Sequence, residues 1–184
     1  MCLENRKSWA FGLFVAVFLS ACGEARLSLL SNDIVPDKAV PAAQLFGVGC
    51  SGANSSPHLR WSGAVPSAVK SYVITVVNRS ESNAVHWLIY DLPISESSLA
   101  TGIVELPQGA TFGPNDFGTV PFGYRGPCAL GAASEVIEFK IWALEVANLS
   151  ELTGVSLVSP ASILAALEES AVISGSFQAL AVGL

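Results

Sequence analysis

The chain has 184 residues, of which 51% are hydrophobic and 13% are charged. This composition excludes a disordered protein, because disorder requires low hydrophobicity and high charge. The net charge of −6 leaves little cationic surface to neutralise phosphates, which argues against nucleic acid as a partner, and the length predicts one domain.

The first 21 residues are typical of a signal peptide. Two basic residues precede the uncharged stretch Trp9–Ala21, which is shorter than the roughly 20 apolar residues of a membrane-spanning helix. Positions 19–22 read LSAC, which resembles the bacterial lipobox, where a signal peptidase cuts before a lipid-modified cysteine. We therefore expect residues 1–21 to be removed and Cys22 to carry a lipid anchor. An ordinary secretory cleavage that leaves Cys22 unmodified is the alternative.

The expected mature protein comprises residues 22–184, a single domain behind a short N-terminal tether. A lipobox places it in a bacterial cell envelope, attached to a membrane through Cys22. Gly23 follows this cysteine, rather than the Asp that commonly retains lipoproteins in the inner membrane. We expect the outer membrane, with the domain on its periplasmic face.

The mature residues predict a mainly β domain. Runs of apolar, β-branched and aromatic residues predict the strands Arg26–Leu30, Ser71–Val77, Val85–Tyr90, Glu135–Val146 and Ser174–Val182. Dense turn-forming residues predict loops at Gly49–Gly63 and Gly102–Tyr124. One late helix is expected, with Ser159 as its N-cap and Pro160 at its first position.

The strand Glu135–Val146 alternates clearly between two faces. Its odd-numbered positions from 137 to 143 are all apolar, whereas Glu138 and Lys140 fall on the other face. Glu135 shares the phase of the apolar positions. We therefore expect its carboxylate to point inward at the open end of the strand.

Two cysteines, Cys50 and Cys128, remain after export and lipidation. A single pair in an oxidising compartment is consistent with a disulfide, and two buried free thiols are the alternative. A bridge would close a loop of about 79 residues and stabilise the fold by roughly 4 kcal/mol in the loop-entropy account.

Standard catalytic and nucleotide-binding motifs are absent from the sequence. The only histidines are His58 and His86, so a three-histidine zinc site cannot be built. We expect no metal and no cofactor.

Five segments in order carry a resemblance to a known family. They are CSGANSSPHLRWSG (50–63), SYVITVV (71–77), HWLIYDLP (86–93), NDFGTVPFGYRGPC (115–128) and FKIWALE (139–145). Together they resemble the bacterial branch of the phosphatidylethanolamine-binding protein family, also called Raf kinase inhibitor-like proteins. The resemblance extends over nearly all of the mature chain, from about residue 27 to residue 184.

The resemblance implies packed β-sheets with a few short peripheral helices, and a small surface pocket that accepts anionic groups such as phosphate esters. It brings Cys50 and Cys128 to the same end of the fold, so we expect them to pair. The pocket residues that it implies here are His86, Gly126, Pro127, Asn78, Ser80, Asp116, Tyr124 and Glu135. Their imidazole, backbone N–H groups and aromatic wall would suit an anion.

Two departures from the family pattern change the charge of this pocket. Asn78-Arg79-Ser80 stands where the family has Asp-Pro-Asp, and Glu135 stands where the family has a second histidine. A carboxylate there repels phosphate, although Arg79 could pair with it or supply positive charge. We therefore expect weak binding of phosphate esters. An empty pocket in a protein that works through another surface is the alternative.

The sequence favours a lipid-anchored binding or regulatory protein without catalysis of its own. Its partner would be a small anionic ligand, a phospholipid headgroup or another protein. One competing hypothesis is a protease inhibitor or protein-interaction module that acts through the loop Gly102–Tyr124. Another is a hydrolase that uses His86 with Asp116 or Glu135, although no paired nucleophile and base stand at a recognisable spacing.

Overall fold

The structure is a computed structural model that describes residues 25–118, 123–129 and 133–183. The expected signal peptide and Cys22 lie outside the described residues. Within these ranges no helix has the length and apolarity to cross a membrane.

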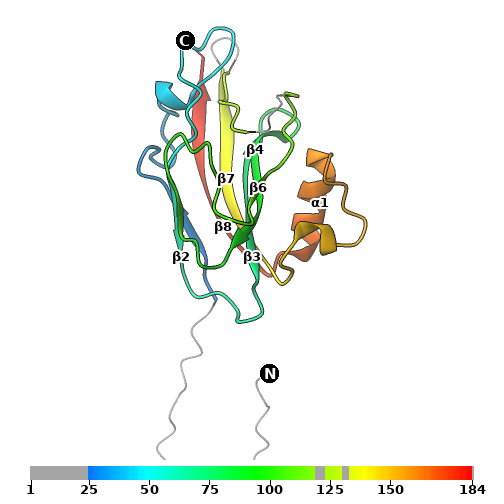
Figure 1. The fold of residues 1–184 in the computed structure, drawn as a ribbon. Coiled ribbons are helices and arrows are strands. Elements are labelled where there is room, and N and C mark those ends of the chain that lie inside the picture. Colours follow the sequence, from blue (N-terminus) through cyan, green and yellow to red (C-terminus); the bar gives the residue numbers. More distant parts are fainter. Residues whose placement is uncertain (1–24, 119–122, 130–132, 184) are drawn as a thin grey trace, which may run out of the picture.

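The described chain contains two antiparallel sheets and one α-helix (Figure 1). The small sheet has the strand order β1-β2-β5, and the large sheet has the order β6-β4-β3-β7-β8. The strands are β1 (Ser28–Leu30), β2 (Leu59–Ser62), β3 (Ser71–Asn78), β4 (Ala84–Pro93), β5 (Ser98–Leu99), β6 (Thr111–Phe112), β7 (Ser134–Leu144) and β8 (Ile173–Val182). The helices are η1 (Ala42–Gln44), η2 (Leu149–Glu151), both 3-10 helices, and α1 (Pro160–Ser170). The expected mainly β class of packed sheets is confirmed.

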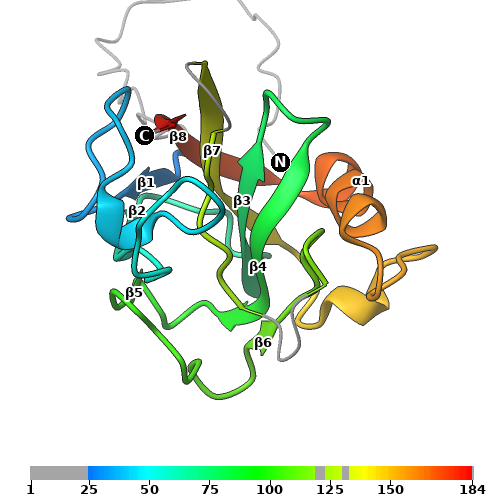
Figure 2. The same ribbon diagram turned by 90° about the horizontal axis from the view of Figure 1, so that it is seen from above.

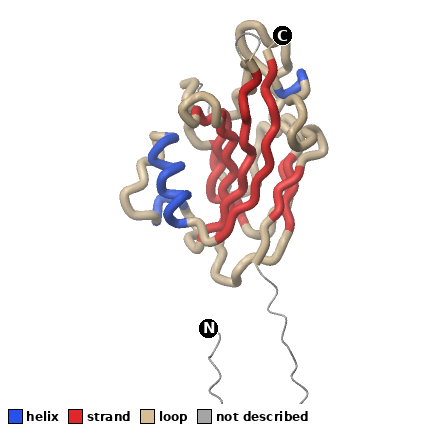
Figure 3. The backbone as a smooth tube through the Cα atoms, turned by 180° about the vertical axis from the view of Figure 1, so that it is seen from behind, coloured by secondary structure: helices blue, strands red, loops and turns tan. Residues whose placement is uncertain are grey.

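The large sheet is the middle of three layers. Figures 2 and 3 show the small sheet on one of its faces and α1 on the other. On the central strand β3, Tyr72, Ile74 and Val76 pack toward the small sheet, whereas Val73 and Val77 pack toward α1. Because side chains alternate along a strand, a strand covered on both faces is apolar at nearly every position.

The expected strands form, with ends that differ by at most three residues, but short strands also form inside the expected loops. β2 lies within Gly49–Gly63, and β6 lies within Gly102–Tyr124. β2 alternates cleanly, with Leu59 and Trp61 buried against the core. Four residues among many Gly, Ser, Asn and Pro give too short a pattern to be distinguished from a loop.

The helix begins as expected. The Ser159 hydroxyl accepts a hydrogen bond from the Ser162 N–H at 3.2 Å, and Pro160 occupies the first turn. Ile163 and Leu167 are fully buried against the large sheet. The spacing that predicted the helix therefore corresponds to its buried face.

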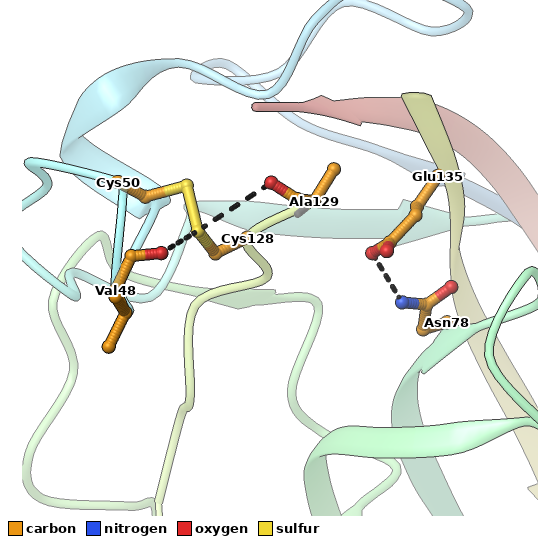
Figure 4. The surroundings of a disulfide bond; sticks show 6 residues. All are labelled: Val48, Cys50, Asn78, Cys128, Ala129 and Glu135. Atoms are coloured by element: carbon orange, nitrogen blue, oxygen red, sulfur yellow. Dashed lines mark hydrogen bonds between the residues drawn. A yellow bond between two sulfur atoms is a disulfide. The ribbon is translucent and has the colours of Figure 1, made fainter. Parts of the chain in front are cut away.

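A disulfide joins Cys50 to Cys128, with 5.9 Å between their Cα atoms (Figure 4). The expected pairing is confirmed, and it links the loop after η1 to the segment that leads toward β7. The Cys128 sulfur lies 3.4 Å from the Val48 carbonyl oxygen. A disulfide sulfur carries no proton, so this is a packing contact rather than a hydrogen bond.

Candidate functional site

A cavity of about 280 Å³ lies at the end of the large sheet where β4 and β7 begin. Its lining residues are Phe46, Gly47, Val48, Glu81, His86, Phe117, Arg125, Gly126, Cys128 and Glu135. Phe46, Val48 and Phe117 are exposed and form an apolar rim, with Val48 the most exposed of the three. The polar groups of the lining are two carboxylates, one guanidinium and one imidazole.

His86 is the buried polar residue of this cavity. The third residue of β4, it is 3% exposed, and its Nδ1 lies 2.8 Å from the Arg125 carbonyl oxygen. Because a carbonyl only accepts, Nδ1 carries the proton and Nε2 is left as an acceptor. Within the described part of the chain, Nε2 has no hydrogen-bond partner.

The environment keeps this imidazole neutral. Burial lowers the pKa of His86 to about 4, and the nearby positive charge of Arg125 acts in the same direction. The hydrogen bond to the Arg125 carbonyl and the negative charge of Asp116 oppose this shift without cancelling it. At neutral pH, His86 therefore offers an electron pair rather than a positive charge.

Glu135 is held by a buried amide. Asn78, at the end of β3, is 1% exposed, and its Nδ2 donates to the Glu135 carboxylate at 2.8 Å (Figure 4). The same Nδ2 lies 3.5 Å from the Glu81 carboxylate. Asn78 Oδ1 accepts from the backbone N–H groups of Ser80 and Glu81. This one amide therefore fixes the β3–β4 turn and connects both carboxylates of the cavity.

Arg125 is the cation of the cavity. Its guanidinium carbon lies 4.2 Å from the Phe46 ring centroid and 5.7 Å from that of Phe117. Its side chain makes no hydrogen bond or ion pair with any of the described residues. The Phe117 ring also lies 4.6 Å from the His86 ring, so the two aromatic rings and the guanidinium form a connected rim.

Arg79 does not pair with Glu135, which was one of the possibilities that the sequence left open. Its guanidinium pairs with Glu138 instead, with Nε donating at 3.0 Å. In the ladder, Val77 of β3 lies opposite Glu138. Arg79 follows Val77 by two positions and so shares its face, whereas Glu135 faces the other way.

Gly126 lines the cavity, but its backbone N–H is already used. It donates to Asn54 Oδ1 at 2.7 Å. A Cβ at position 126 would lie 2.3 Å from the Gln44 carbonyl oxygen, so only glycine allows this approach of the two loops. The structure thus gives Gly126 a packing role and no free donor for an anion, and Pro127 is buried beside it outside the lining.

Three other residues implied by the resemblance lie outside this cavity. Asp116 accepts the Val85 N–H at 2.7 Å and faces a separate hollow beside α1. Tyr124 donates its hydroxyl to the Gln44 carbonyl at 3.0 Å and lines a third hollow. The Ser80 hydroxyl accepts the Val136 N–H at 2.9 Å. Each one holds a loop or strand end in place.

Sequence reasoning missed Arg125, Glu81, Phe46 and Phe117 as cavity residues. Arg125 directly precedes the glycine of the GPC block, and this adjacency is the one signal that could have indicated it. Glu81 and Phe117 likewise directly follow Ser80 and Asp116, which the resemblance implied, whereas Phe46 comes from a loop whose approach depends on tertiary packing. No three His, Cys, Asp or Glu side chains among the described residues are arranged to hold a metal ion.

A small cavity that places a few charged groups among apolar side chains, at one end of a two-sheet β domain, is typical of a ligand-binding site. The family model for phosphatidylethanolamine-binding protein matches residues 31–179, and the chain belongs to this family. Its expected family membership is therefore confirmed.

Bacterial relatives agree with this assignment. The UPF0098 protein YbcL of Escherichia coli (strain K12) is 34% identical over 135 residues, which cover 68% of this chain and 72% of the relative. YbhB of the same organism is 30% identical over 138 residues, which cover 71% of this chain and 85% of the relative.

Solved structures show the same fold. The crystal structure of Escherichia coli YbcL, described as a new member of the mammalian PEBP family, matches with a TM-score of 0.74 and 28% identity, covering 85% of this chain and 98% of that one. A Chlamydia trachomatis homologue of phosphatidylethanolamine-binding protein matches with a TM-score of 0.66 and 25% identity, covering 84% and 95%.

Proposed function

We propose that this chain is an exported, lipid-anchored binding or regulatory protein whose cavity at His86 and Glu135 holds a small ligand. The observation that carries the proposal is the His86 side chain, which is 97% buried, lines the cavity, and leaves Nε2 without a partner among the described residues. A buried polar atom that is left unsatisfied costs free energy. Nε2 is almost fully enclosed, so a ligand donor would remove that cost after a small shift of the imidazole toward the cavity.

The composition of the lining supports binding over hydrolysis. It contains no serine or threonine, and its one cysteine, Cys128, is in the disulfide. The carboxylate of Asp116, which a hydrolase could pair with His86, already accepts a backbone N–H and faces another hollow. The described cavity thus lacks an activated nucleophile. We propose no catalytic role.

The charges support an altered ligand preference. Glu135 and Glu81 line the cavity together, and the only cation in the described lining is Arg125. Two like charges about 4 Å apart interact by roughly 4 kcal/mol at an effective dielectric of about 20, which corresponds to about a thousandfold in affinity. We therefore expect phosphate monoesters to bind weakly.

Calorimetric titration with glycerol 1-phosphate tests this proposal. The natural protein should bind weakly or undetectably, and Glu135→His should bind measurably because it exchanges a negative for a neutral or positive group. Adding Arg125→Gln to that variant should abolish the gain, because Arg125 is the cation of the described lining. Tight binding by the natural protein, or no change on Glu135→His, would contradict the assignment of Glu135 to the ligand site.

A further inference from the structure

We propose that the cavity recognises a small, free zwitterion by its amine: the ligand's primary ammonium group lies at Glu135 and Glu81, and its acidic group lies at Arg125. This inference deepens the proposed binding function and rests on it. It assigns the inner part of the cavity, around Glu135, Glu81 and His86, to a cation. A phosphate pocket would hold an anion there.

The inner part of the cavity presents acceptors. The carboxylates of Glu135 and Glu81 are connected through the Asn78 amide, and His86 contributes an Nε2 acceptor that no described residue uses. A primary ammonium has three N–H donors and no acceptor, so both carboxylates can accept from it, and a small shift of the enclosed imidazole would add Nε2 as the third acceptor. The depressed pKa of His86 keeps its imidazole from competing with the ligand for the carboxylates.

Arg125 supplies the complementary end. Its guanidinium rests over the Phe46 ring, and it forms no ion pair within the described residues. A planar guanidinium that is already positioned by stacking binds a carboxylate in a bidentate manner with little further ordering. The charged groups of the described lining sum to one negative charge, so an amine is favoured and a simple anion is not.

The size and place of the cavity favour a free molecule over the headgroup of an anchoring lipid. Its volume of about 280 Å³ falls below the usual range for drug-sized ligands. Glu135 pairs with Ala181 on β8, whereas the Leu27 backbone lies against Gly175, six positions along the same strand. At about 3.4 Å per residue, the start of the fold is thus roughly 20 Å from the cavity end.

This separation would orient the domain on a membrane if the chain is tethered through Cys22. Only three residues lie between Cys22 and Arg26, whose N–H bonds to Ala64 at that same far end. A lipid on Cys22 would hold this end near the membrane and the cavity away from it. A ligand would then reach the cavity from the aqueous side.

Calorimetry on the full chain, purified from membranes in detergent, tests the inference with three probes. Ethanolamine carries the amine alone, glycerol 1-phosphate carries the anion alone, and β-alanine carries both an amine and an acid. β-Alanine should bind most tightly, followed by ethanolamine, with glycerol 1-phosphate weakest.

Variants test the contacts at the two ends of the ligand separately. Glu135→Gln keeps an acceptor for Asn78 and should weaken both amines at least tenfold, about 1.4 kcal/mol. Arg125→Gln should weaken β-alanine at least tenfold and leave ethanolamine unchanged or slightly tighter. Glu145→Gln makes the same charge change at an exposed position after β7, far from the cavity, and should change neither.

The outcomes also separate this inference from the function on which it rests. If glycerol 1-phosphate binds most tightly and Glu135→Gln strengthens it, the amine assignment is wrong and a binding site remains. If neither amine binds, the inference is wrong; if Glu135→His also binds no glycerol 1-phosphate, the binding function fails with it. Preferential sedimentation with phosphatidylethanolamine vesicles over phosphatidylcholine vesicles would overturn the assignment to a free ligand.

Discussion

At the scale of single residues, burial determines the protonation state of His86. Its imidazole is enclosed by β4, the Phe117 ring and the Arg125 backbone, and it faces Arg125, Glu81 and Glu135 in the cavity. Desolvation outweighs the hydrogen bond to the Arg125 carbonyl and the negative charge of Asp116, so the neutral form is favoured. The residue therefore acts as a hydrogen-bond acceptor at neutral pH.

This environment predicts a pH dependence of stability. The pKa of His86 is about 4 in the folded protein and about 6.5 when unfolded, so the unfolded state binds more protons between these values. Stability contributed by neutral His86 is complete above pH 6.5 and declines as pH falls to about 4, by roughly 3 kcal/mol. Urea unfolding across this range should show the decline, and His86→Gln should remove it.

The chain offers an internal control, because it contains only two histidines. Proton NMR should resolve two imidazole C2 signals, and His58→Gln assigns them by removing one. The His86 signal should titrate near pH 4. A His86 signal that titrates near 6.5 would contradict the burial argument.

At the residue scale, the direction of a side chain could be predicted where it follows from the alternation along a strand. The phase of its strand placed Glu135 on the inward face, and the structure puts it in the cavity. The partner of Arg79 could not be predicted, because its pairing with Glu138 depends on the register between β3 and β7. The hydrogen bond from Asn78 to Glu135 spans 57 positions of sequence and depends on the same register.

At the scale of elements, long strands were predictable and short ones were not. β7 has eleven residues of alternating or continuous apolar character, which no loop would show. β5 and β6 have two residues each and form only because a longer neighbour offers an edge. The loops that carry Phe46 and Arg125 show no hydrophobic periodicity, so the cavity rim could not be predicted from the sequence.

The disulfide joins two of these loops, and its removal should destabilise the fold. Reduction frees the loop between Cys50 and Cys128, which costs roughly 4 kcal/mol in the loop-entropy account. The urea midpoint should fall in the presence of reductant, and Cys50→Ser with Cys128→Ser should show the same midpoint with or without it. Two free thiols from this pair, titrated in the unfolded, unreduced protein, would contradict the bridge.

At the scale of the whole molecule, the cavity and the start of the described chain lie at opposite ends of the large sheet. A tether at Cys22 would therefore leave the cavity open to solvent. The orientation matters because it separates the proposed ligand from the lipids of the anchoring membrane.

The proposed lipid tether predicts how the chain is processed at Cys22. The natural protein should fractionate with membranes, in the outer membrane of a two-membrane cell, and mass spectrometry should find a diacylglyceryl group on Cys22. Cys22→Ala should release the protein or stall its cleavage, whereas Cys2→Ala, inside the removed segment, should change nothing. An unmodified N-terminal Cys22 on native protein would contradict this account.

A crystal structure with bound β-alanine would show directly which end of the ligand the carboxylates hold. We expect the ligand in the cavity, with its nitrogen within hydrogen-bond distance of the Glu135 carboxylate and its carboxylate at the Arg125 guanidinium. A ligand bound in the reverse orientation, with its carboxylate beside His86 and its amine outside, would contradict the proposed polarity. A ligand bound only outside the cavity would contradict the site.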